Sequence, residues 1–201
     1  DVYKRQNLGC KVNAYETEAM QHLLEEAGYE IVPFTQKADV YVINTCSVTN
    51  MADRKSRQML HKAKKNNPDS IVVAAGCYVQ TSEKEVLNDL SVDIVIGNDR
   101  KHDLVRLLEE YSLDSVNDTV DDINDGKHDF EELFIDQTKE HTRAFIKVQD
   151  GCNQFCSYCI IPYARGRVRS RRFENVIAEV ERLAANGFKE VVLTGIHLSS
   201  Y

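Results

Sequence analysis

The sequence lacks any apolar run that approaches the roughly 20 residues of a membrane-spanning helix. It also lacks a secretory signal, in which a basic segment and a short apolar run precede a cleavage site. Six cysteines without an export signal favour a reducing compartment, where clustered cysteines are more often metal ligands or catalytic thiols than disulfides. We therefore expect a cytoplasmic metalloprotein with no membrane partner.

A fourth cysteine is missing from the densest cysteine motif. The stretch "DGCNQFCSYCIIP", residues 150–162, places Cys152, Cys156 and Cys159 at the spacing C-x3-C-x2-C. A structural zinc site uses four ligands, commonly from paired C-x2-C elements, and His141 lies too far upstream to complete a usual finger. A [4Fe–4S] cluster held by three thiolates keeps one iron open for a small molecule. The motif favours such a cluster, with zinc as the alternative.

Helix and strand patterns alternate from Ala14 to Leu108, which predicts a mostly parallel sheet wrapped by helices. Buried strands are expected at "DVYVINT", "SIVVAAG" and "VDIVIG", because these runs are almost wholly apolar. Helices are expected at "AYETEAMQHLLEEAGY", at "NMADRKSRQMLHKAKKNNP", at "SEKEVLNDL" with a cap, and at "KHDLVRLLEEY". The first helix should follow a strand, so residues 1–6 are interpreted as truncated or foreign sequence.

The carboxyl-terminal third predicts one βαβ unit. The strand "TRAFIKVQDG" leads into the cysteine loop, followed by the helix "FENVIAEVERLAANG" and the strand "KEVVLTG". One such unit is not a closed domain, so we expect the start of a truncated (β/α) barrel. The fold class is thus α/β, with an amino-terminal domain over residues 1–111, a connector over 112–140, and the truncated second domain over 141–201.

Charge is distributed unevenly. The net charge is −7, and the connector alone carries −8, from ten acidic residues against Lys127 and Lys139. The overall acidity therefore says little about partners. A short strand is expected within the connector at "LFID". The segment "ARGRVRSRR" instead gathers five arginines.

The other three cysteines occupy equivalent places. Cys46 and Cys77 each follow a buried strand, and Cys10 lies just before the first helix. The carboxyl ends of parallel strands share one edge, where ligands bind, so these thiols should converge. Gly9 and Gly76 precede two of them and allow tight turns. The alternative is that each cysteine is a buried small hydrophobic residue.

The stretch "CNQFCSYC" resembles the cluster motif of radical S-adenosylmethionine (SAM) enzymes, with an aromatic residue before the last cysteine. The stretches "NLGCKVNAYETEAM", "NTCSVTNMADRKSRQ", "GCNQFCSYCIIPYARGRVRSR" and "TGIHLSSY" resemble the radical SAM methylthiotransferases. The resemblance spans residues 7–201. "GCKVNAYE" and "HTRAFIKVQDGCNQFC" are similar to the branch that modifies threonylcarbamoyladenosine in tRNA.

The resemblance implies a specific activity, the methylthiolation of C2 of the modified adenine at position 37 of tRNA. Cys152, Cys156 and Cys159 would hold a [4Fe–4S] cluster that binds and reductively cleaves SAM. Cys10, Cys46 and Cys77 would hold an auxiliary [4Fe–4S] cluster that carries the inserted sulfur. A second SAM would supply the methyl group, because the cofactors carry the difficult chemistry. The implied partners are the tRNA anticodon stem-loop, an electron donor and a sulfur source.

Three other residues are candidate cofactor or tRNA contacts. Arg165 and Arg167 could bind tRNA phosphates or the SAM carboxylate, against the alternative of a solvated basic loop. Tyr158 could contact the adenine of SAM, against the alternative of a core aromatic. The family motif also includes Asn13, Asn44, Lys55, Ser56 and Arg57.

Two competing functions remain open from the sequence. One keeps the chemistry but changes the substrate to isopentenyladenosine-37 of tRNA or an aspartate of a ribosomal protein. The other is a non-catalytic iron–sulfur or zinc protein, such as an electron carrier, although a carrier would saturate its cluster with four cysteines. With the barrel unfinished, we expect the fragment to be inactive alone.

Overall fold

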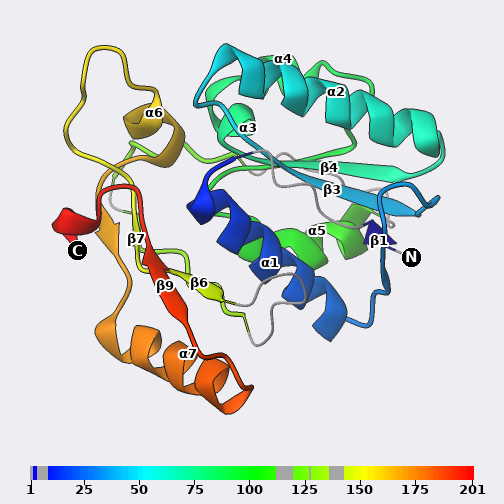
Figure 1. Cartoon of the computed structure of the whole chain (residues 1–201). Helices are drawn as coiled ribbons and strands as arrows, with labels where there is room; N and C mark the ends of the chain where they lie inside the picture. The colour runs from blue at the N-terminus through cyan, green and yellow to red at the C-terminus, as the bar shows by residue number, and fades with distance from the viewer. Residues whose placement is uncertain (1, 4–8, 112–119, 127, 136–142) are drawn as a thin grey trace.

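The structure is a computed structural model that describes residues 2–3, 9–111, 120–126, 128–135 and 143–201. Its amino-terminal part is a parallel sheet with the strand order β2-β1-β3-β4-β5 and helices on both faces (Figure 1). The strands are β1 (Val2–Tyr3), β2 (Ile31–Val32), β3 (Val40–Thr45), β4 (Ile71–Gly76) and β5 (Ile94–Ile96). The predicted α/β class with a parallel sheet is confirmed.

The helices of this part follow the strands in alternation. They are α1 (Lys11–Glu26), α2 (Asn50–Asn66), α3 (Cys77–Thr81), α4 (Glu83–Leu87), the 3-10 helix η1 (Lys101–Asp103) and α5 (Leu104–Tyr111). The Thr49 hydroxyl caps α2 by accepting a hydrogen bond from the backbone N–H of Ala52. The cap predicted for α4 is wrong, because the Ser82 side chain makes no cap hydrogen bond. The short helix α3 was not predicted.

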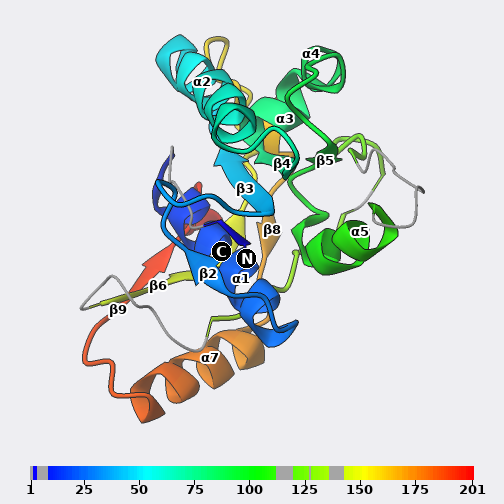
Figure 2. The ribbon, with the colours of Figure 1, turned by 90° about the vertical axis from the view of Figure 1, so that its right-hand side faces the viewer.

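The sheet is buried on both faces, as its apolar strands require. Side chains along β3 alternate between the two faces, since successive residues of a strand point to opposite sides. Tyr41 and Ile43 pack in a core with Leu60 of α2, whereas Val40 and Val42 pack with Leu24 of α1 and Leu107 of α5. Strands β4 and β5 contribute to both cores, and α3 and α4 contribute to the first. Figure 2 shows α2 on one side of the sheet and α1 and α5 on the other.

The carboxyl-terminal part contains the predicted βαβ unit. Strand β6 (Ala144–Lys147) pairs in parallel with β9 (Val191–Thr194), and α7 (Phe173–Ala185) connects them. Between them, β7 (Gln149–Asp150) pairs antiparallel with β8 (Arg169–Ser170) and encloses α6 (Ile161–Arg165); the 3-10 helix η2 (Leu198–Ser200) follows β9. The βαβ unit predicted for this part of the chain is therefore confirmed.

Two sequence expectations concern the segments at the margins of the described ranges. Residues 133–135 of "LFID" form no strand, so that prediction is wrong for them, and Asp136 lies outside the described residues. Strand β1 does precede α1, as expected for a first strand, and it pairs with both β2 and β3. The interpretation of residues 1–6 as foreign sequence stays a prediction, since residues 1 and 4–6 lie outside the described residues.

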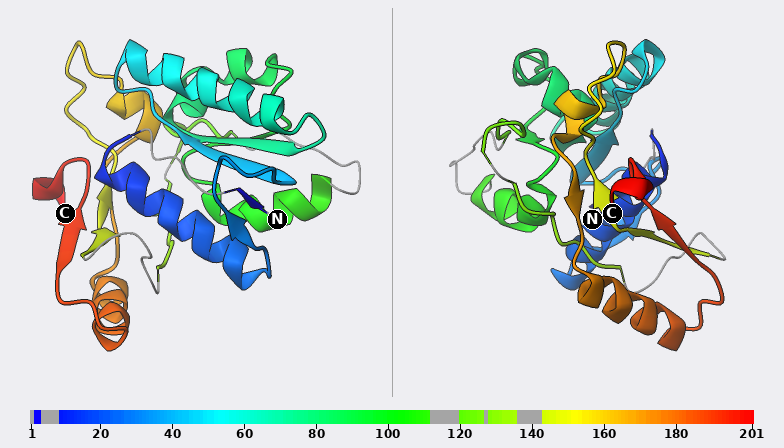
Figure 3. Two further views of the ribbon diagram at one scale, coloured as in Figure 1. Left: turned by 45° about the vertical axis from the view of Figure 1, so that its right-hand side comes forward. Right: turned by 90° about the vertical axis from the view of Figure 1, so that its left-hand side faces the viewer.

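Helix α1 lies between the two parts (Figures 1 and 3). Leu24 faces the sheet, while Tyr15 and Ala19 pack in a separate core with Ile146 of β6 and Leu183 of α7. Helix α1 therefore makes apolar contacts on two sides, and it is buried at every position from Val12 to Met20. Within the described ranges, no helix is long and apolar enough to cross a membrane.

Candidate metal and cofactor site

Three cysteines follow neighbouring strands at the carboxyl edge of the sheet. The strand order reverses beside β1, and open α/β sheets bind ligands at the carboxyl ends of the strands near such a point. Cys10 precedes the first residue of α1, Cys46 follows β3, and Cys77 is the first residue of α3, directly after β4. The edge predicted from the sequence is therefore the edge at which all three cysteines lie.

The three thiols at this edge differ in their exposure to solvent. Burial raises the pKa of Cys46, and the charges of Cys77 and Cys10 raise it further, against a lowering hydrogen bond with the backbone of Val48. Cys46 and Cys77 are buried, whereas Cys10 is exposed. The three thiols thus share one environment that opens to solvent at Cys10.

Residues of the family motif hold the backbone around Cys46 and Cys77. The Ser56 hydroxyl accepts from the N–H of Cys46 and donates to its carbonyl, both at 3.2 Å. Asn44 donates to the carbonyl of Asn13 at 3.0 Å. Gly76 has a φ of +98°, and a Cβ at this position would lie 2.5 Å from the Asn44 side-chain oxygen. Only glycine fits here, so this turn sets the direction of Cys77.

The loop with Cys152, Cys156 and Cys159 is closed at its base. The β7–β8 pairing joins its two ends, and the N–H of Cys152 donates to the carbonyl of Gly166 at 3.1 Å. The N–H of Cys159 donates to the carbonyl of Cys156 at 2.9 Å, which forms a turn between two candidate ligands. These bonds constrain the loop without engaging any thiol, so the sulfurs stay available.

A cavity of about 570 Å³ has one of the candidate ligands, Cys159, in its lining. One wall follows Cys46 and the end of α3, and the other is the end of the cysteine loop. It is lined by Ser47, Val48, Thr49, Asn50, Asp53, Thr81, Ser82, Tyr158, Cys159, Ile160 and Ile161. Tyr158 is 91% exposed, which rules out the core-aromatic alternative and leaves its ring free beside this cavity.

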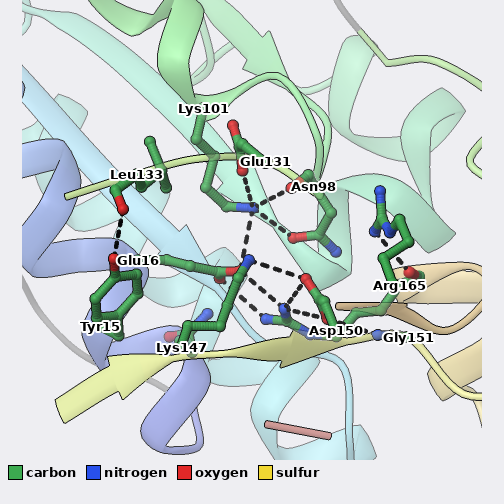
Figure 4. Close-up of polar contacts among 12 residues, drawn as sticks. Tyr15, Glu16, Asn98, Lys101, Glu131, Leu133, Lys147, Asp150, Gly151 and Arg165 are labelled. Atoms are coloured by element: carbon green, nitrogen blue, oxygen red, sulfur yellow. Dashed lines mark hydrogen bonds and ion pairs between the residues drawn. The ribbon is translucent and has the colours of Figure 1, made fainter. Parts of the chain in front are cut away.

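The structure gives Arg165 a different setting from the one expected. Its guanidinium donates to both carboxylate oxygens of Glu16, at 2.8 and 3.0 Å, and to Asp150 at 3.1 Å (Figure 4). The residue is 1% exposed, so it does not face solvent where tRNA phosphates would bind. Asp150 lies just before the cysteine loop and Arg165 lies after it, so these bonds fix the base of the loop to α1.

The arginine segment is not a solvated basic loop. Arg165, Arg169 and Arg171 are buried, and Arg171 pairs with Glu132 at 2.9 Å and with Glu179. Arg167 and Arg172 are exposed. The guanidinium of Arg167 lies 4.3 Å from the ring centre of Phe155 in the cysteine loop, a cation–π distance. Of the two arginines predicted as ligand contacts, Arg167 is thus the one that solvent can reach.

Sequence reasoning missed a buried ionic cluster around Glu16. Its further members are Lys147, 2.8 Å from Glu16, and Lys101, 3.7 Å from Glu16. Burial works against the charge of Glu16, but Arg165, Lys101 and Lys147 hold the pKa of its carboxyl well below the usual range. Glu16 lies in the stretch of α1 that is buried from Val12 to Met20, where an acidic side chain needs a partner.

The cysteine groups fit an iron–sulfur cluster better than a single ion. Among the described residues, no group of three or more cysteine, histidine or acidic side chains is close enough to hold one metal ion. In a cubane each thiolate binds its own iron, so cluster ligands stay further apart than the ligands of one ion. Two groups of three thiols have the donor set of such clusters.

Comparisons with known proteins agree with these observations. Residues 3–97 match the uncharacterized protein family UPF0004, and residues 146–201 match the radical SAM superfamily. The threonylcarbamoyladenosine tRNA methylthiotransferase MtaB of Bacillus subtilis is 47% identical over 96% of this chain and 43% of its own length. MtaB of Aquifex aeolicus is 46% identical over 98% of this chain and 48% of its own length. The chain thus spans less than half of these relatives.

A solved structure shares the fold. The radical SAM methyltransferase TsrM of Kitasatospora setae, determined with cobalamin and a [4Fe–4S] cluster bound, aligns with a TM-score of 0.63 at 14% identity, covering 98% of this chain and 47% of that one. SAM and an iron–sulfur cluster are the cofactors to which the superfamily match points. The two domain matches and the MtaB relatives together show that the chain belongs to the radical SAM methylthiotransferase family, in its MtaB-type branch.

Proposed function

We propose that the protein methylthiolates C2 of N6-threonylcarbamoyladenosine at position 37 of tRNA. The observation that carries the proposal is the presence of two three-cysteine groups, one at the carboxyl ends of the sheet strands and one in the loop after β7, in a chain 46–47% identical to MtaB proteins. Relatives named as dimethylallyladenosine synthases are less similar, at 35% identity, which favours the threonylcarbamoyl substrate. We place this activity in the cytoplasm, where tRNA is modified.

Cys152, Cys156 and Cys159 would hold the cluster that binds SAM, and Cys10, Cys46 and Cys77 would hold an auxiliary cluster. When bound, the two clusters supply the reductive cleavage of SAM and the sulfur that is inserted. Tyr158 is free to stack on an adenine in the cavity, and exposed Arg167 is free to bind a phosphate or carboxylate. Val48, Ile160 and Ile161 give the cavity an apolar wall against which a nucleobase could pack.

The domain division follows from the same assignment. Residues 1–111 would be the auxiliary-cluster domain, residues 112–140 the connector, and residues 141–201 the start of the SAM-binding domain. An electron donor and a sulfur source complete the set of partners, with the tRNA anticodon stem-loop as substrate. The isolated 201-residue chain should be inactive, and turnover by this chain with tRNA and SAM would contradict that.

The substrate is tested by deleting the gene and analysing tRNA nucleosides by mass spectrometry. We expect methylthio-threonylcarbamoyladenosine to disappear and its unmodified precursor to accumulate. An unchanged level would refute the proposed substrate, and loss of methylthio-isopentenyladenosine instead would assign the other tRNA branch. Reconstitution of the full-length protein should yield about eight irons, as two cubane clusters require. Stoichiometric zinc without iron would identify a structural metal site instead.

A further inference from the structure

The Asn98 side chain contacts a candidate cluster ligand directly. Its amide nitrogen donates to the sulfur of Cys77 at 3.5 Å and to the carbonyl of Ala164 on α6 at 2.5 Å. The amide carries two N–H groups, so each acceptor receives one. Asn98 is 1% exposed. It therefore joins the thiol of Cys77 to the helix that follows the SAM-binding cysteine loop, in a place from which water is excluded.

A neighbouring charge determines which way this amide points. The Lys101 ammonium donates to the side-chain oxygen of Asn98 at 2.9 Å and to its backbone carbonyl at 2.7 Å. An ammonium has donors and no acceptor, so the amide oxygen must face Lys101. A flipped amide would direct its N–H groups at Lys101 and its oxygen at the Ala164 carbonyl. The N–H groups are thus committed to Cys77 and Ala164.

Lys101 is itself held by the ionic cluster between the two parts of the chain. It is fully buried and lies 3.7 Å from Glu16 and 3.9 Å from Glu131. Glu16 also binds Arg165, at the base of the cysteine loop, and Figure 4 shows these side chains around the Lys101 ammonium. A continuous series of polar contacts therefore runs from the sulfur of Cys77 to the loop that carries Cys152, Cys156 and Cys159.

We infer that Asn98 is a positioning residue for Cys77 and raises the reduction potential of the cluster proposed on Cys10, Cys46 and Cys77. The inference rests on the proposed function. A hydrogen bond to a ligand sulfur stabilises the reduced cluster, which carries the additional negative charge. Such outer contacts orient and tune metal ligands. Because the site is buried, the amide bond is stronger than it would be in water.

The test isolates the auxiliary cluster in the full-length protein. Replacing Cys152, Cys156 and Cys159 together by alanine removes the other candidate cluster, so the remaining iron reports on this one. In that background, Asn98→Leu and Asn98→Ala both remove the N–H donors, and neither adds a charge. We expect a redox titration followed by EPR to give a more negative midpoint potential for both variants than for their parent.

Asn67→Leu serves as the matched control. Asn67 is also buried and donates to the carbonyl of Ala38 at 2.8 Å, but it lies just before β4, at the opposite edge of the sheet from the cysteines. Its midpoint potential should equal that of the parent. If Asn98→Leu fails to fold, the smaller and uncharged Asn98→Ala decides the test.

The outcomes separate the two proposals. About four irons per chain with an unchanged midpoint in the Asn98 variants would overturn the tuning role and leave the auxiliary cluster intact. A parent protein that binds no iron would overturn both the cluster and the inference. A negative shift confined to the Asn98 variants would establish the bond to Cys77 as functional, because a general loss of stability does not move a midpoint potential in one direction.

Discussion

At the scale of single residues, Glu16 is the side chain on which most buried charge depends. It is fully buried, and Arg165, Lys147 and Lys101 all lie within 3.7 Å of its carboxylate. Buried ion pairs contribute modestly to stability as intact units, but the loss of one partner leaves uncompensated charge away from water. Glu16 balances three cations from three separate elements, so its removal should affect the molecule more than its single charge suggests.

Replacing Glu16 by glutamine should therefore lower the free energy of unfolding by about 3–5 kcal/mol, the usual cost of breaking a buried pair. Urea denaturation of the full-length protein measures this. Glu26→Gln is the control on the same helix, since the Glu26 side chain is 63% exposed, and it should change stability by less than about 0.5 kcal/mol. Equal effects of the two substitutions would show that the buried ionic cluster contributes no more to the free energy of unfolding than an exposed charge does.

At the scale of elements, the sequence predicted the regular strands and long helices because they repeat a simple pattern. The mostly apolar run "VYVINT" forms β3, and the segment with helical periodicity that begins at Asn50 forms α2. It did not predict α3, α6 or β8, which have five residues or fewer and depend on tertiary contacts. Two to five residues contain only about one period of a helix or a strand, which is too little to set such a segment apart from a loop unless its flanking residues supply a further signal.

The β7–β8 pairing is one of these unpredicted elements, and it makes Gly151 sensitive to substitution. Gly151 has a φ of +71°, and a Cβ there would run into the carbonyl of Arg167 on the opposite arm of the loop. Gly187 also has a positive φ, of +92°, but nothing lies within 4 Å of its Cβ position. A substitution at either glycine therefore strains the backbone, but only a substitution at Gly151 also produces a steric clash.

We expect Gly151→Ala to lose the cluster proposed on Cys152, Cys156 and Cys159, while Gly187→Ala keeps it. Iron per chain in the reconstituted full-length protein should fall by about half for Gly151→Ala, because only one of the two proposed cubane sites is displaced. The Gly187→Ala protein should retain its iron and lose only about 1 kcal/mol of stability from the left-handed backbone. Full iron content in Gly151→Ala would show that the loop tolerates the displacement.

At the scale of the whole molecule, the two parts of the chain meet through α1 and the ionic cluster rather than through the connector alone. The sequence identified the six cysteines and the sheet edge, because cysteine spacing and strand ends are local features. It predicted a ligand contact for Arg165, because the sequence alone does not distinguish an arginine that faces solvent from one that pairs with a buried carboxylate. The partner Glu16 is 149 residues away in sequence, and only the folded chain brings the two together.

The acid sensitivity of this interface follows from Asp150. Burial works against its charge, but Lys147 and Arg165 hold the pKa of its carboxyl well below the usual range. A carboxyl whose pKa is lower in the folded state contributes stability above its unfolded pKa, about 3.9, and loses that contribution as the pH falls below it. The folded protein should therefore weaken progressively in acid, from about pH 5 downwards.

Asp150→Asn tests this directly, because the amide cannot titrate. The variant should be less stable than the natural protein by about 3–5 kcal/mol at pH 7, where the natural carboxylate is fully charged. The difference should shrink as the pH falls below about 4, since the natural protein loses its own contribution there. Urea midpoints measured between pH 3 and pH 7 give both curves. Burial raises the pKa of Glu179, which opposes this trend, but Glu179 is present in both proteins and its effect cancels in the difference. A constant gap across the whole range would mean that Asp150 acts through packing and not through its charge.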